Sequence, residues 1–391
     1  MIYRGHEDMT GSDFSAHNEK VVSLWESYHA QRPRRVPVIF GINPRFILLD
    51  PKLNDNAVTF ERYSSDPEVM LDIQLKTAEY IRLNIPQDAP MGLPERWNVS
   101  VDLQNYYEAA YLGAPVRFSE GAVPVAEKFL TDQNKYELLE KGPVDPHKTP
   151  LGRKMREIYY YMLARREEGF LYRGRPLGEV VPRGLGTDGP FTLFVSLRGE
   201  SALVDMYIEP EYFHRMMAFL TDFIISDIRA TRRLAGRQER PESFDFADDS
   251  IELLGASDYR EHVLPYHRRL IDELAGAGPH SMHICGDVQR HFPTLKAELG
   301  IRSIDTGFPI DWSTLRDEVG DDVEIYGGVH ADMLRRAGPE RITAEVERIL
   351  GSGIMRGGRF VLREANNLAP GTPLANLHAM YEAAREYGRY S

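Results

Sequence analysis

The chain has 391 residues, of which 42% are apolar and 27% charged, as in a globular protein with a sizeable core. Its formal net charge of −12 argues against binding nucleic acid or an anionic membrane surface as its main task, because both need a positive face. No apolar run is long enough for a membrane span, and the N-terminus lacks the apolar segment of a signal peptide. Cys285 is the only cysteine, which excludes an intrachain disulfide, and we expect the protein in the cytoplasm.

The first half of the chain alternates between clear elements and irregular stretches. Residues 1–17 form a polar leader, and the globular domain is expected over 18–391. Asp66 and Pro67 are a cap and a first helical residue, which predicts the start of a long helix. The expected elements are a helix near 19–29, a strand at 35–41, a helix at 66–83, a strand at 98–102, and an insertion around 117–188.

From residue 189 onward, short apolar strands alternate regularly with amphipathic helices, which is typical of parallel βα units. We therefore predict an α/β protein that forms a closed (β/α)8 barrel as a single domain. The main competitor is an open doubly wound sheet, but no Gly-rich dinucleotide loop follows the first strand. The eight predicted strands are centred near residues 38, 100, 193, 245, 282, 303, 325 and 361.

Polar side chains gather at or just after the C-terminal ends of these strands, where barrel enzymes carry their chemistry. Each has a plain structural explanation when taken alone, because an aspartate or His330 can cap a helix and Arg198 can close a surface ion pair. Their number exceeds what capping needs, so we predict an active site. The residues are Asn43, Arg45, Asp102, Ser196, Arg198, Asp248, Asp249, His283, Cys285, Asp287, Asp305, His330, Glu364, Asn366 and Asn367.

His283 and Cys285 lie two residues apart at the end of one predicted strand. Residues i and i+2 of a strand face the same side, so the imidazole and the sulfur can converge on one point. This pair is half of a tetrahedral zinc site. The alternative is a buried cysteine beside a core histidine, since free cysteine often acts as a small apolar residue.

Three segments carry a resemblance to the uroporphyrinogen decarboxylase superfamily, a (β/α)8-barrel family of decarboxylases and cobalamin-linked methyltransferases. His283-Ile284-Cys285-Gly286-Asp287 resembles the His-x-Cys-Gly-Asn zinc segment of the methyltransferase branch. Residues 369–377 are similar to the C-terminal signature, and residues 189–193 with 198–200 to a mid-barrel segment. Asp102 falls where the decarboxylases carry their essential aspartate. The resemblance spans roughly residue 18 to the end.

Two departures place the chain nearer the methyltransferase branch, with an altered zinc site. Where those enzymes have a second cysteine after the last strand, and the decarboxylases a histidine, this chain has Asn366. The decarboxylases grip substrate carboxylates with two arginines in the first loop, and here Arg45 stands alone.

The resemblance implies a corrinoid-linked methyltransferase or demethylase component that acts on a small methylated substrate or methyl acceptor. Zinc would be held by His283 and Cys285 with Glu364 or Asp248 as third ligand; without zinc, Asp102, His283 and His330 would serve as acid/base groups. The corrinoid would ride on a separate protein, because the chain has no Asp-x-His-x-x-Gly segment. The remaining residues expected to bind the cofactor or substrate are Arg45, Ser196, Arg198, Asp248, Asp305, Asn366 and Asn367.

Two other functions stay open at this point. One is a cofactor-independent decarboxylase in which Asp102 stabilises a protonated pyrrole. The other is a non-catalytic relative that binds a tetrapyrrole or a corrinoid protein. The sequence leaves both a monomer and a homodimer open.

Overall fold

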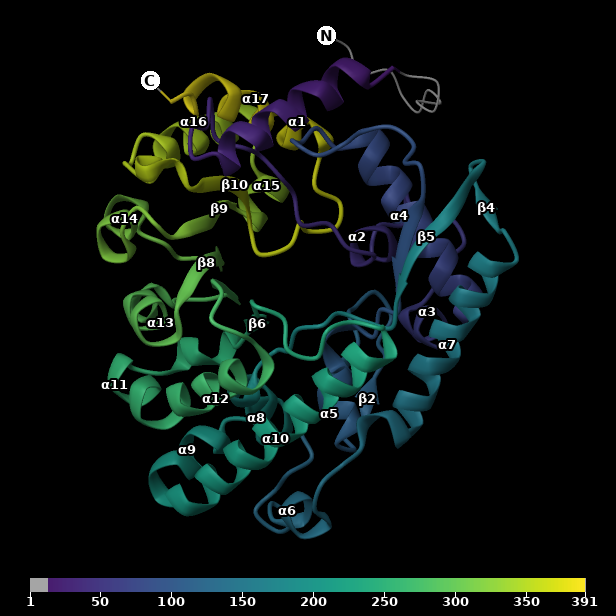
Figure 1. Cartoon of the computed structure of the whole chain (residues 1–391), viewed down its shortest axis with the longest axis vertical. Helices are drawn as coiled ribbons and strands as arrows, with labels where there is room; N and C mark the ends of the chain where they lie inside the picture. The colour runs from purple at the N-terminus through teal and green to yellow at the C-terminus, as the bar shows by residue number, and fades with distance from the viewer. Residues whose placement is uncertain (1–12, 391) are drawn as a thin grey trace.

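The computed structural model describes residues 13–390, and it arranges the strands in a ring with the helices on the outside (Figure 1). Residues 1–12 of the predicted leader lie outside the described residues, and the first helix begins at Ser15. None of the described helices combines the length and the apolar character needed to cross a bilayer.

One half of the ring is a five-stranded parallel sheet whose strands are neighbours in chain order. Residue 38 continues it, because Val38 forms a parallel bridge to Leu362 of the last strand. The predicted strands near 245, 282, 303, 325 and 361 are confirmed. They are β6 (Asp245–Ala247), β7 (His280–Ile284), β8 (Ile301–Thr306), β9 (Glu324–His330) and β10 (Phe360–Ala365).

The other half of the ring is paired less continuously. β1 (Trp97–Ser100), the predicted strand near 100, pairs in parallel with β5 (Arg175–Val181), which also pairs with the short antiparallel β4 (Leu171–Tyr172). Beyond β5, the Ala247 amide donates to the Thr187 carbonyl oxygen at 2.9 Å. Among the described residues no strand ladder joins Val38 to β1 or β5 to β6. The parallel α/β architecture is therefore confirmed, while the hydrogen-bonded closure of the barrel is not observed.

The predicted strand near residue 193 is wrong, because α8 (Pro190–Arg198) is a helix. Its apolar residues are buried as in a strand, so the apolar run alone did not distinguish the two. Pro190 occupies the first helical turn, and two backbone amides of that turn donate to the carboxylate of Asp248, which lies more than fifty residues further along the chain. The third strand of the ring is β5, inside the stretch predicted as an insertion.

Helices cover the outer side of the ring, and their starts follow ordinary capping rules. The predicted helix over 66–83 is confirmed as α4, where the Asp66 carboxylate accepts hydrogen bonds from the amides of Glu68 and Val69 and Pro67 is the first helical residue. The longer helices are α1 (Ser15–His29), α4 (Pro67–Asn84), α7 (Pro150–Glu167), α10 (Pro210–Leu234), α12 (Leu264–Leu274), α13 (Phe292–Leu299), α14 (Trp312–Val319), α16 (Pro339–Leu350) and α17 (Leu374–Tyr387).

Shorter elements fill the connections between strands and helices. Buried apolar residues from all the strands of the ring form one continuous core. The remaining helices and short strands are α2 (Arg45–Leu48), α3 (Phe60–Ser65), α5 (Tyr107–Tyr111), β2 (Val116–Arg117), β3 (Val125–Ala126), α6 (Glu137–Lys141), α9 (Ser201–Ile208), α11 (Ala256–Asp258) and α15 (Ala331–Arg336).

Candidate active site and metal centre

A cavity of about 590 Å³ opens where the C-terminal ends of the strands meet. Its walls come from the loop after residue 41, from α4, from β1 and the segment that follows it, from the segment that follows β5, and from β6 and β7. Because parallel strands end at the same side of the ring, these segments bring Arg45, Asp102, Asp188 and His283 into one lining although they are far apart in the chain.

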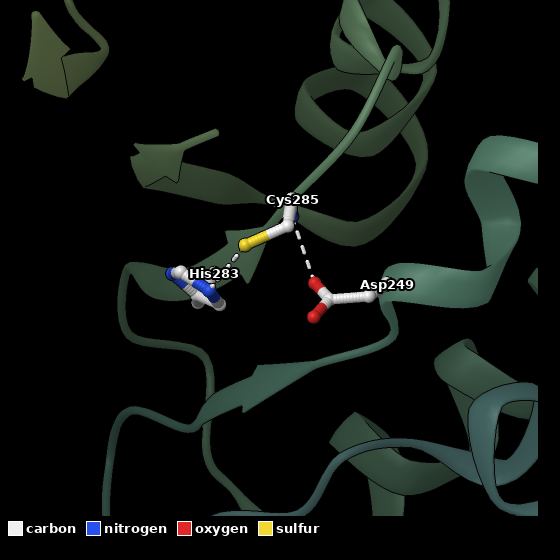
Figure 2. A group of neighbouring side chains, drawn as sticks. All are labelled: Asp249, His283 and Cys285. Atoms are coloured by element: carbon white, nitrogen blue, oxygen red, sulfur yellow. Dashed lines mark hydrogen bonds between the residues drawn. The ribbon is translucent and has the colours of Figure 1, made fainter. Parts of the chain in front are cut away.

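His283, Cys285 and Asp249 form a compact group beside this cavity (Figure 2). The potential ligand atoms of the three side chains all lie within 4.8 Å of one another, with His283 Nε2 3.0 Å from Cys285 Sγ. The Cys285 amide donates to Asp249 Oδ1 at 2.7 Å. The sheet register pairs Ala247 with His283, so the loop after β6 runs beside the end of β7. The predicted convergence of the imidazole and the sulfur is confirmed.

Asp305 orients the imidazole of this group. His283 Nδ1 lies 2.8 Å from Asp305 Oδ2, which leaves Nε2 facing the sulfur, and Arg363 donates to the same carboxylate oxygen at 2.8 Å. Burial acts to lower the pKa of His283, but the hydrogen bonds and charges of Asp305 and Cys285 outweigh it and raise that pKa to about 11. Burial also raises the pKa of the Cys285 thiol. A carboxylate behind a histidine is the usual support of a metal-binding imidazole.

The two acids predicted as a third metal ligand, Glu364 and Asp248, lie outside the group, and Asp249 stands there instead. Asp248 is fully buried and its carboxylate accepts hydrogen bonds from the amides of Phe191 and Thr192 and contacts His267 Nε2 at 2.9 Å. Consecutive residues at the end of a strand point in different directions, so Asp248 anchors α8 and Asp249 approaches His283 and Cys285.

Glu364 is fully buried behind Arg363. Its Oε1 accepts hydrogen bonds from the Gly41 amide at 2.8 Å and from Arg363 at 2.9 Å, while Oε2 has no hydrogen-bond partner among the described residues. Burial raises the pKa of Glu364 to about 7, although the charge of Arg363 opposes that rise. Glu364 therefore acts on the site through Arg363, which in turn holds Asp305.

Asp102 lines the cavity as predicted and is held by three hydrogen bonds. Tyr63 donates its hydroxyl to Asp102 Oδ2 at 2.9 Å, and Gln104 donates both its side-chain amide, at 2.6 Å, and its backbone amide, at 2.9 Å. Arg45 also lines the cavity, and it donates to the side-chain oxygens of Gln104 and Asn105. Burial lowers the pKa of Arg45. Gln104 thus fixes the carboxylate and the guanidinium relative to each other.

Asp188 is a cavity residue that the sequence reasoning missed. Burial, followed by the charges of Asp249 and Asp248, raises the pKa of Asp188 to about 6. Behind it, Glu108 accepts hydrogen bonds from the Thr187 hydroxyl at 2.6 Å and from the Asp188 amide. Burial and the charge of Asp188 raise the pKa of Glu108 to about 8. A sequence signal for Asp188 exists, because Asp188 follows a strand, β5. The prediction puts that strand near residue 193, after Asp188, and so misses the aspartate.

The other predicted residues lie farther from the group. His330 caps α15 by accepting the Asp332 amide, and Asn366 has a left-handed backbone (φ 79°) whose carbonyl accepts a hydrogen bond from Arg363. Asn367 donates to the Asn366 side chain. Ser196 and Arg198 lie on α8 outside the cavity lining, where Arg198 is buried and paired with Asp205 and Asp132. The predicted strand end that should have carried these two does not exist.

The chain is similar to known proteins in sequence and in structure. A profile of the uroporphyrinogen decarboxylase (URO-D) family matches residues 23–387. The methylated-thiol–coenzyme M methyltransferase of Methanosarcina mazei is 31% identical over 202 residues, which are 50% of this chain and 51% of that protein. The methylcobamide:CoM methyltransferase of Methanosarcina acetivorans is 23% identical over 202 residues, 51% of this chain and 56% of that protein. The chain thus spans about half the length of these curated relatives.

Among solved structures, a methyltransferase from Methanosarcina mazei superimposes with a TM-score of 0.64 at 17% sequence identity. The match covers 94% of this chain and 98% of that one. At this identity the likeness concerns the fold. Together with the profile match it implies the (β/α)8 architecture, in a form whose strand ladder is interrupted at two places among the described residues.

Proposed function

Because the chain belongs to the uroporphyrinogen decarboxylase family, we propose that it is a corrinoid-linked methyltransferase or demethylase component. It would move a methyl group between a small substrate or acceptor and a cobalamin carried by a partner protein. The observation that carries the proposal is the His283–Cys285–Asp249 group at the cavity. The names of two relatives, methyltransferases of methylated thiols and of methylcobamide, agree with it.

The donor set of this group fits zinc. One imidazole nitrogen, one thiolate sulfur and one carboxylate oxygen are ligands that zinc prefers, and three protein ligands are typical of a catalytic zinc with an open position. Asp305 supplies the outer support that such an imidazole needs. When bound there, zinc would supply Lewis acidity that lowers the pKa of a thiol, amine or hydroxyl at the open position.

The surrounding residues would bind and orient the other reactant. Asp305 keeps His283 Nε2 turned toward the sulfur, and the Cys285 amide keeps Asp249 beside the sulfur. Elsewhere in the cavity lining, Gln104 holds Asp102 and Arg45 together, so a substrate that presents a donor and an anionic group can engage both. Asp102 would then accept or return a proton at the substrate, as a carboxylate within hydrogen-bond reach can do.

Methyl transfer with free cobalamin tests this proposal. The zinc-loaded chain is incubated with reduced cobalamin and a panel of methylated thiols, amines and aryl methyl ethers, and separately with methylcobalamin and thiol acceptors. We expect methyl transfer in one direction, its loss in Cys285→Ser, and unchanged transfer in Arg166→Gln, which alters an exposed residue of α7. Absence of transfer in both directions with the whole panel contradicts the proposal.

A second function, cofactor-independent decarboxylation of a porphyrinogen, is favoured by the position of Asp102 in the cavity. The charge of the lining argues against it. Asp102, Asp188 and Asp245 are carboxylates, Arg183 is already paired with the buried Asp227, and Arg45 alone remains for the substrate's carboxylate arms. Uroporphyrinogen turnover by the purified chain, abolished in Asp102→Asn, would establish this second function; no turnover by the wild-type chain would remove it.

A further inference from the structure

A second cavity, of about 540 Å³, lies at the other end of the segment around Val38. Arg34 and Arg35 precede Val38 and line this second cavity, whereas Arg45 follows Val38 and lines the active-site cavity. The walls of the second cavity are α1, residues 34–35, Asp88 and α17, and the two helices lie next to each other near the chain ends (Figure 1).

The lining of this cavity is basic in a chain that is acidic overall. Among the described residues of the lining Asp88 is the one carboxylate, and Arg35 neutralises it with two hydrogen bonds of 2.6 and 2.5 Å, while Tyr381 and the Val38 amide also donate to it. The basic residues of the lining are His17, Lys20, Arg34, Arg35, Arg385 and Arg389.

Three of these cations make no ion pair within residues 13–390, although Glu382 and Glu386 line an adjacent pocket together with Arg389. Arg385 donates to Glu382, but Lys20, Arg34 and Arg389 have no carboxylate oxygen within 4.0 Å among residues 13–390. Their side chains are exposed at the rim. Like charges that line one cavity repel, and an anion bound between them would offset that repulsion.

Backbone hydrogen bonds join the chain segments that carry Arg34, Arg35 and Arg389. Arg35 and Arg389 form an antiparallel bridge, and the Tyr390 amide donates to the Arg34 carbonyl oxygen at 3.2 Å. The guanidinium groups of Arg35 and Arg385 lie 6.0 and 5.7 Å from the centre of the Tyr381 ring. The two chain segments thus bring the backbones of Arg34 and Arg389 close to each other at the cavity.

We propose that this cavity binds a small phosphate-bearing molecule through Arg34, Arg389 and Lys20, at a site separate from the active-site mouth. Guanidinium groups match the oxygens of a phosphate in pairs, and a phosphate carries more negative charge than a single carboxylate. The cavity has the size usual for small-molecule sites, so it accommodates a nucleotide-sized ligand as well as inorganic pyrophosphate.

Calorimetric titration of the full chain with inorganic pyrophosphate, and separately with ADP, in buffer free of divalent cations tests this site. We expect binding that weakens about tenfold or more in Arg34→Gln/Arg389→Gln, because two charge-assisted contacts are lost. Tighter binding of ADP than of pyrophosphate would assign the site to an organic phosphate, and equal binding to the phosphate groups alone; both support the proposal.

Two matched variants control for general charge effects and for the mouth. Arg166→Gln/Arg215→Gln removes the same charge from exposed positions on α7 and α10, which do not line the cavity, and Arg45→Gln alters the mouth. Both should keep wild-type affinity for pyrophosphate, and thermal unfolding without ligand should show that all variants fold. No binding to wild type at millimolar pyrophosphate, or equal weakening in the control pair, would overturn the proposal.

Discussion

The two halves of the strand ring hold functional residues by different means. From β6 to β10 the strands pair without interruption, and their register sets His283 beside Asp305 and beside the end of β6, after which Asp249 accepts the Cys285 amide. Around β1 and β5 the ladder is interrupted, and side-chain hydrogen bonds from Tyr63, Gln104 and Thr187 position the acids instead. The continuous half is thus suited to a fixed metal group and the interrupted half to substrate, and variants in each half should separate the two roles.

The largest expected effect lies in the interrupted half. Asp102→Asn should lower methyl transfer by about 10²–10⁴-fold, the usual contribution of a general acid or base, because the amide cannot take up a proton. Its zinc content should equal that of wild type, since Asp102 has no contact with the metal group. Loss of zinc in this variant would break the proposed division between the halves.

Next comes the adjacent pair Asp248 and Asp249 in the continuous half. Asp248→Ala leaves the buried His267 and the first turn of α8 without their partner and should lower the free energy of unfolding by about 3–5 kcal/mol. Asp249→Ala loses one hydrogen bond to the Cys285 amide and should cost about 1 kcal/mol. Urea unfolding of the metal-free proteins measures both; equal losses would mean that the two aspartates do not differ in role.

A smaller effect is expected at Asp305, the carboxylate that orients the His283 imidazole. Asp305→Asn should weaken zinc binding about 10–100-fold, because the amide orients the His283 ring less strongly than the carboxylate does. Competition with a zinc chelator measures the affinity. Asp311→Asn, a change at the exposed cap of α14, serves as control and should bind zinc like wild type.

A further effect is a pH dependence of stability in the interrupted half. Glu108 has a folded-state pKa of about 8, above its ordinary value of 4.5, so its contribution to stability is fully present below about pH 4.5 and is lost as pH rises toward 8. The charged groups that face it are Asp188, Arg183 and Asp227. Glu108→Gln, which removes the ionisation, should gain on wild type by up to about 1.4 kcal/mol per pH unit in that range.

Unfolding in urea at pH 5, 6, 7 and 8 measures this gain. The exposed Glu168→Gln on the C-terminal side of α7 is the control, and its stability relative to wild type should not vary with pH. A constant difference between Glu108→Gln and wild type from pH 5 to pH 8 would mean that Glu108 is ionised throughout.

The two halves also differ in how much the sequence foretold. In the continuous half, alternating apolar residues predicted each strand and the spacing of His283 and Cys285 predicted their convergence, because a strand has a fixed period of two. In the interrupted half, the apolar run at 190–197 fits a strand or a buried helix, and the Asp248 carboxylate that caps that helix comes from a distant segment. This misplacement concealed Asp188 and brought Ser196 and Arg198 into the predicted site.

The third member of the metal group could not be read from the sequence for a related reason. Asp248 and Asp249 are adjacent, and the packing of α8 decides which of them is buried against that helix and which approaches Cys285. Asn366 in place of a second cysteine likewise gave no hint that an aspartate from the loop after β6 would approach Cys285.

Metal content of the purified, zinc-dialysed chain tests the central claim most directly, with Cys285→Ser measured beside it. If His283, Cys285 and Asp249 bind zinc, wild type should retain about one zinc per chain and the variant far less, because a hydroxyl is a much poorer ligand than a thiolate. A wild-type content well below one, or equal contents in the two proteins, would contradict the account.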